Sequence, residues 1–156
     1  MTASLETLVG ILKDQTEAAR QLLAVLEEET VVLAAAKPAS IEEVAQRKLT
    51  LADTLEDLEL RRRSTVGALR LPLKLTELGE ALATAGVPRG AEICLLLEKV
   101  ALACGERNQA SALLLASRQQ HVKRALELLT GQTAETELYG PSRSRRSGGG
   151  RSWARA

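Results

Sequence analysis

The chain has 156 residues, of which 45% are apolar but only 1% aromatic, and Leu, Ala, Glu, Arg and Gln dominate it. These residues are mostly strong helix formers, so one domain of packed helices is favoured over a sheet. Residues 1–140 carry 16 basic and 20 acidic groups, whereas five arginines and no acidic residue follow them. This balance excludes a nucleic-acid-binding domain as the body of the protein.

The amino-terminal residues lack the basic and then apolar pattern of a signal peptide, and no apolar run approaches the roughly 18 residues that cross a bilayer. The two cysteines, Cys94 and Cys104, are ten positions apart. On one helix they would be separated by about 15 Å, which is too far for a disulfide. Buried, reduced thiols are typical of the cytosol, so we expect a cytoplasmic protein.

The first predicted helix covers residues 4–36, and Gln15 and Glu29 interrupt its apolar stripe. The stripe has heptad-like spacing and consists of Leu5, Leu8, Leu12, Ala19, Leu22, Leu26 and Leu33. Pro38 ends this helix, because the residue before a proline disfavours helical geometry. Ser40 followed by Glu43 predicts a capping box for the next helix, and so short a connection predicts an antiparallel hairpin.

The second predicted helix carries an apolar face formed by Ile41, Val44, Leu51, Leu55, Leu58, Val66 and Leu69. Lys48 and Arg62 share this face, where polar residues weaken packing but help to fix the register. The charged run 56–63 predicts a solvated face with an i,i+4 pair between Glu59 and Arg63, and a ligand site is the alternative.

After a break at Pro72, residues 76–83 predict a short helix that is closed by Gly86 to Pro88. A long helix follows from Arg89, with Gly131 where a left-handed C-terminal cap is expected and a short turn to Gly140. Its apolar residues recur at three-four spacing, and two apolar clusters, 93–97 and 112–116, wrap most of a turn. The helix therefore needs neighbours on more than one side.

Small residues also line the long helix, at Ala101, Cys104, Gly105, Asn108 and Ala112. A glycine inside a helix costs about 1 kcal/mol relative to alanine, so close approach of another helix is expected to compensate. That neighbour is either a helix of this chain or a helix of a partner.

These elements predict an all-α fold, an elongated antiparallel helical bundle or coiled coil of three long helices plus one short helix. We expect residues 1–140 to form the helical domain and residues 141–156, which are basic and of low complexity, to form a flexible tail.

No pattern in the sequence indicates catalysis, a metal or a cofactor. His121 is the only histidine and has no Asp or Cys within a helical turn. Cys94, Cys104 and His121 lack metal-ligand spacing, and Gly148 to Gly150 lack the flanking strand and helix of a phosphate-binding loop. We therefore expect neither an enzyme nor a small-molecule substrate, and the surface remains as the functional feature.

The carboxyl-terminal half contains an ordered set of motifs: Asn108, Leu114-Leu115, the stretch 122–131 and Leu138-Tyr139-Gly140. In this set it resembles the FlgN family of flagellar type III export chaperones. The stretch 22–29, a proline-containing turn and Gln46-Arg47-Lys48 add a compatible pattern in the first half, so the resemblance covers about residues 5–140. Departures occur at Gly105 and Gln109, in the region where the family often has Asn-x-x-Asn-Gly, and at Arg143, where a glycine is frequent. The resemblance implies a protein that binds hook-filament junction proteins (FlgK and FlgL) through their disordered terminal helical segments. It also implies that the chaperone keeps them unassembled and delivers them to the export gate.

On this interpretation the partner-binding residues are Asn108, Leu114, Leu115, Val122, Leu126, Leu129, Tyr139 and Gly140. Some of the leucines must instead pack inside the bundle, and Tyr139 either contacts the export gate or packs on Leu129. Two alternatives stay open: a structural coiled coil that self-assembles through these leucines, and a nucleic-acid-associated factor that uses the arginines and Trp153 of the tail. A third possibility is that the tail only keeps the protein soluble.

Overall fold

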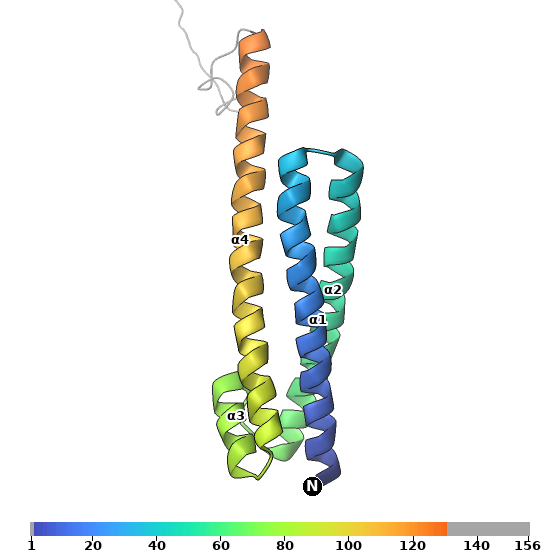
Figure 1. The fold of residues 1–156 in the computed structure, drawn as a ribbon, viewed down its shortest axis with the longest axis vertical. Coiled ribbons are helices and arrows are strands. Elements are labelled where there is room, and N and C mark those ends of the chain that lie inside the picture. Colours follow the sequence, from blue (N-terminus) through green and yellow to red (C-terminus); the bar gives the residue numbers. More distant parts are fainter. Residues whose placement is uncertain (1, 131–156) are drawn as a thin grey trace, which may run out of the picture. The chain divides into compact units, whose positions relative to one another are not determined.

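The protein is all-α, as the sequence predicts. The structure, a computed structural model, describes residues 2–130, apart from the side chains of 117–127 and 130. It contains α1 (Thr2–Ala35), α2 (Pro38–Leu69), α3 (Leu75–Thr84) and α4 (Pro88–Thr130), which are the predicted three long helices and one short helix (Figure 1). The chain divides into two compact units, residues 1–112 and residues 113–156, which we call the bundle unit and the C-terminal unit. Helix α4 contributes residues to both.

Helices α1 and α2 form an antiparallel hairpin (Figure 1). The ion pair from Arg47 to Glu28 (2.8 Å) lies near the turn, and the hydrogen bond from Gln15 to Glu59 (3.0 Å) lies further along both helices. Lys48 also pairs with Glu29 across the same interface. Polar pairs therefore help to fix the register of the hairpin together with the leucines, as the position of Lys48 on the apolar face predicts. Arg62, for which the same role was predicted, bonds instead to Glu59 of its own helix and to the carbonyl of Leu73.

The predicted capping box at Ser40 is wrong. Helix α2 begins three residues earlier, at Pro38, and its N-cap is Lys37, which makes no side-chain capping bond. Lys37 has the extended conformation (φ −96°, ψ 109°) that a following proline imposes. Proline itself is well suited to the first helical position, where its fixed φ fits and its missing N–H is not needed.

Helix α3 packs closely against the first turns of α4. A Cβ on Gly90 would lie 2.8 Å from Leu82 Cδ1, so a larger residue here would force the Leu82 side chain to move, and glycine suits the close approach of the two helices. Two chain reversals place residues 88–112 of α4 in the same direction as α1. Two contacts mark this direction: the Cys104 thiol donates to the Ala19 carbonyl (3.3 Å), and further along both helices Arg107 pairs with Glu27 (3.5 Å).

The core of the bundle unit is built mainly from leucines of α1, α3 and α4. The apolar cluster consists of Leu8, Leu12, Ala19, Leu26, Val66, Leu78, Leu82, Cys94, Leu97, Val100 and Cys104. Both predicted interruptions of the α1 stripe, Gln15 and Glu29, are buried as well. Each has a partner on α2, so the interruptions belong to the helix interface rather than to solvent. Within the described residues, no helix is long and apolar enough to span a membrane.

Candidate functional site

The amino-terminal part of α4 hides its apolar face inside the bundle unit. Leu97, Val100 and Cys104 are buried, and so is Ser111, about two helical turns after Cys104. Burial raises the pKa of the Cys104 thiol, and it raises the pKa of Cys94 to about 11 against the smaller opposing effect of the Arg62 charge. Both thiols therefore stay protonated at neutral pH, as expected for structural rather than reactive cysteines.

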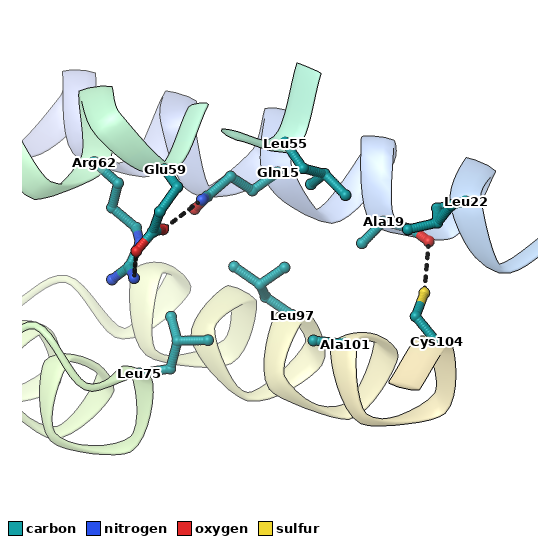
Figure 2. A pocket seen from close by; sticks show the side chains of 10 residues that line it. All are labelled: Gln15, Ala19, Leu22, Leu55, Glu59, Arg62, Leu75, Leu97, Ala101 and Cys104. Atoms are coloured by element: carbon teal, nitrogen blue, oxygen red, sulfur yellow. Dashed lines mark hydrogen bonds and ion pairs between the residues drawn. The ribbon is translucent and has the colours of Figure 1, made fainter. Parts of the chain in front are cut away.

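A cavity of about 350 Å³ lies among the four helices of the bundle unit (Figure 2). Leu22, Leu55 and Leu97 line it, and its polar end is formed by Gln15, Glu59 and Arg62. The Arg62 guanidinium donates to both Glu59 oxygens (2.9 and 2.8 Å) and to the carbonyl of Leu73 (2.9 Å). This network spans α1, α2 and the α2–α3 connection and orients them.

Glu59 accepts more hydrogen bonds than any other described carboxylate. Burial alone would raise the pKa of Glu59, but donors from Arg62 and Gln15, the Arg62 charge and a donor from Arg63 together lower it. The predicted i,i+4 pair between Glu59 and Arg63 is present at 3.0 Å. Arg62 is buried, however, so this part of the charged run is a structural element rather than an entirely solvated face.

In the C-terminal unit, several leucine side chains of α4 are exposed to water. Among its described side chains, Leu113 is 68% exposed, Leu128 is 84% exposed and Leu129 is 82% exposed. Leu115 is exposed to 40%, and Leu114 is half-buried. Large apolar side chains that gather on one helix in contact with water are typical of surfaces that bind a partner.

The structure places the predicted partner-binding residues in different settings. Asn108 is exposed on α4 in the bundle unit, and Leu115 and Leu129 are exposed in the C-terminal unit. Val122 and Leu126 lie on α4, but their side chains fall outside the described residues, as does that of His121. Tyr139 and Gly140 fall outside them entirely, together with the predicted cap at Gly131.

Sequence reasoning missed a second row of exposed leucines on α4. Leu95 and Leu102 are 70% and 64% exposed, and Leu113 follows them. Their spacings of seven and eleven residues are close to multiples of 3.6, so the helical period places them on a common face. That spacing was available in the sequence, but Leu95 and Leu113 were treated only as members of the apolar clusters 93–97 and 112–116, and Leu102 was not singled out.

The small-residue stripe remains open to solvent at its glycine. A Cβ on Gly105 would meet nothing within 4 Å among the described residues, and Ala101, Asn108 and Ala112 are exposed. Only Cys104 of this stripe is buried, against α1. The structure thus shows no described helix of the same chain in close approach at Gly105.

No group of three or more His, Cys, Asp or Glu side chains in the described part of the chain is arranged to hold a metal ion. The features that the structure does bring together are a helical bundle and leucines in contact with water on α4. These features are typical of helical proteins that bind a partner through a helix face.

Comparison with known proteins identifies the family. A family model described as "FlgN protein" matches residues 1–147, so the chain belongs to the FlgN family and is a flagellar export chaperone. This is a family of chaperones rather than of enzymes. No curated protein and no solved structure matches the chain.

Proposed function

We propose that this chaperone binds the disordered terminal helical segments of hook-filament junction proteins of the FlgK and FlgL type. It holds them unassembled in the cytoplasm and delivers them to the export gate. The observation that carries the proposal is the exposure of leucines on α4: Leu115 and Leu129 are 40% and 82% exposed, and their neighbours Leu113 and Leu128 are 68% and 84% exposed. Membership of the FlgN family supports the choice of client.

The physical basis is the burial of one amphipathic face by another. A segment that later coils into a filament has an apolar stripe that must be covered beforehand, and a leucine-bearing helix can receive it as an added helix. Ordering a disordered segment on binding costs free energy, which keeps the affinity moderate and makes release possible. The holding step needs no nucleotide or metal.

Within this surface we assign Leu114, Leu115, Val122, Leu126 and Leu129 to the client, with Asn108 orienting it. In the bundle unit, the preceding apolar positions of the same three-four pattern, such as Leu97, Val100 and Cys104, are buried. The pattern continues at Leu115, Val122 and Leu129. A client helix would cover these later positions as the bundle covers the earlier ones.

Co-purification tests the proposal directly. The chaperone should retain each junction protein that has its terminal helical segments and lose it when those segments are deleted. A filament protein from the same flagellum serves as the control client. Equal retention of intact and truncated junction proteins would refute the proposal.

The alternative of a self-assembling coiled coil predicts a different result in the same preparation. Light scattering would then find a stable higher oligomer that binds no client, because a second copy would cover the leucines. A nucleic-acid-associated factor would instead lose its function on deletion of residues 141–156, which we propose to be a tail separate from the helical domain 1–140.

We also propose that Tyr139 and Gly140 contact the export gate. Tyr139→Ala should leave helicity and client binding unchanged and reduce delivery, measured as secretion of the junction proteins. Loss of the fold in this variant would show that the tyrosine instead caps the helix end by packing on Leu129.

A further inference from the structure

A second groove in the bundle unit lies between α3 and α4 and encloses about 380 Å³. Its lining residues recur every three or four positions on each helix, at Thr76, Gly79 and Ala83 on α3 and at Ala91, Cys94, Leu95 and Glu98 on α4. Residues at this spacing share one face of a helix, so the groove follows both helices for about two turns. It therefore has the form of a channel that can receive the ridge of another helix.

Small side chains hollow the groove, and a large apolar one borders it. A Cβ on Gly79 would lie 3.4 Å from the Cβ of Cys94, so α3 and α4 are already close together at its base. Ala83 and Ala91 leave room above this contact. Leu95 is 70% exposed at the edge. A bulky apolar side chain from an added segment would fill this space and cover Leu95.

Glutamates line both sides of the groove, with Glu80 on α3 and Glu92 and Glu98 on α4. None of the three belongs to an ion pair between described residues, although Glu98 is half-buried. The groove thus combines an apolar floor with negative charge on each side that no described cation neutralises. Its chemical complement is an apolar residue with positive charge on both sides.

We propose that the α3–α4 groove binds a partner protein through a short helical segment in which a bulky apolar residue, such as tryptophan, is flanked by arginines or lysines. The apolar residue lies on the small side chains, and the cations pair with the glutamates of both helices. Each such pair is weak by itself, so binding depends on the set of charges together with the apolar anchor and is weakened by salt. The groove uses none of the residues assigned to the client, so its partner is a different protein.

A designed peptide tests the proposal on the full chain. The probe is a fluorescein-labelled alanine–glutamine helix with one central tryptophan and two arginines on each side of it. Fluorescence anisotropy should show saturable binding of one peptide per chain, with a Kd that rises several-fold when NaCl is raised from about 0.05 to about 0.5 M. A peptide with alanine in place of tryptophan should bind about tenfold more weakly, and one with glutamates in place of arginines should not bind. Equal Kd values for the three peptides, or no saturable binding of the probe, would overturn the proposal.

Charge reversal in the chain locates the contact. Glu92→Lys with Glu98→Lys should weaken binding of the probe about tenfold or more, because it places like charges opposite the arginines. Glu43→Lys with Glu106→Lys makes the same change in net charge at exposed positions that do not line the groove, and it should change Kd far less. Equal effects of the two double variants would show a non-specific attraction and refute the site. Circular dichroism checks that each variant is folded.

The apolar part has its own matched pair. Ala83→Phe fills the groove from α3, whereas Ala110→Phe adds the same bulk at an exposed position of α4 outside the groove. Only the first should weaken binding of the probe, and an unchanged Kd for Ala83→Phe would place the peptide elsewhere and contradict the proposal. If sedimentation finds dimers of the chain that the probe disperses, a second copy occupies the groove, and a partner of different sequence is refuted.

Discussion

The two parts of α4 carry the same apolar pattern and expose it to different degrees. In the bundle unit, Leu97 is only 5% exposed and Val100 only 9%. In the C-terminal unit, Leu115 and Leu129 are 40% and 82% exposed. The spacing of apolar residues along a helix determines which of them share a face, but the neighbours available to that face determine whether it is covered.

The difference has an energetic meaning. Full burial of a leucine side chain contributes about 1.5–3 kcal/mol relative to leaving it in water. The exposed leucines of α4 therefore hold a binding free energy that the chain does not use for its own folding. Covering them with a partner's apolar face would release it, less the cost of ordering that partner.

The largest expected effect compares leucines from the two parts of α4. Leu97→Ala should lower the free energy of unfolding by about 2–5 kcal/mol, because it leaves a cavity in the core. Leu129→Ala should change it by less than about 0.5 kcal/mol, because its side chain is already in water. Urea unfolding followed by circular dichroism measures both, and equal losses would show that the two parts are buried alike.

For client binding, the exposed leucines of the C-terminal unit should matter more than they do for stability. Replacing Leu128 and Leu129 together by serine should weaken the binding of a junction-protein terminal segment about tenfold or more, roughly 1.4 kcal/mol. Leu60→Ser is the control, since Leu60 is 63% exposed on α2. Calorimetry measures the affinity, and an unchanged Kd for the double variant would remove these leucines from the client surface.

Gly105 provides a smaller and more specific test. Gly105→Ala should raise the free energy of unfolding by about 0.5–1 kcal/mol, since an added Cβ meets no described atom and alanine favours the helix. If the glycine exists for the close approach of a client helix, the same variant should bind its client more weakly. A loss of stability instead would mean that a helix of the protein itself packs there.

The smallest effect concerns pH, and it should be confined to the bundle unit. Because the pKa of Glu59 is held below its ordinary value of 4.5, its ionised form stabilises the fold at neutral pH. This contribution is lost as the pH falls below 4.5 and the folded protein takes up the proton. It should amount to a few tenths of a kcal/mol, because solvent screens the pair.

The Glu59→Gln variant isolates this contribution. The difference in unfolding free energy between the wild type and Glu59→Gln should shrink as the pH is lowered from 7 to 3. Client binding through the C-terminal unit should not follow the same titration. A difference in stability that stays constant over this range would show that Glu59 does not titrate with folding.

The helices could be predicted from sequence because their signals are local. Apolar spacing and the breaks at Pro38, Pro72 and Pro88 bring every helix within a few residues of its observed bounds, since backbone geometry at a proline does not depend on distant contacts. The start of α2 was missed by three residues because Pro38 and Ser40 both carry helix-start signals. The helix begins at the proline, which is well suited to the first helical position.

The partition of leucines between core and surface could not be predicted in the same way. Leu97 and Leu115 occupy equivalent positions of one repeating pattern, and nothing in their neighbouring residues says which has a partner in the chain. The burial of Gln15 and Glu29 was missed for a related reason, because their partners on α2 are 44 and 19 residues away. Such information lies in tertiary pairing rather than in periodicity.

The polar pairs across the α1–α2 hairpin have a consequence for a protein that handles foreign helices. A guest helix rich in leucine resembles α1 or α2 closely enough to compete for the same neighbour. It would leave Gln15 and Glu29 without their partners in a buried place, a loss of about 1–3 kcal/mol for each stranded group. On the proposed function, these pairs would therefore disfavour the exchange of α1 or α2 for a client helix.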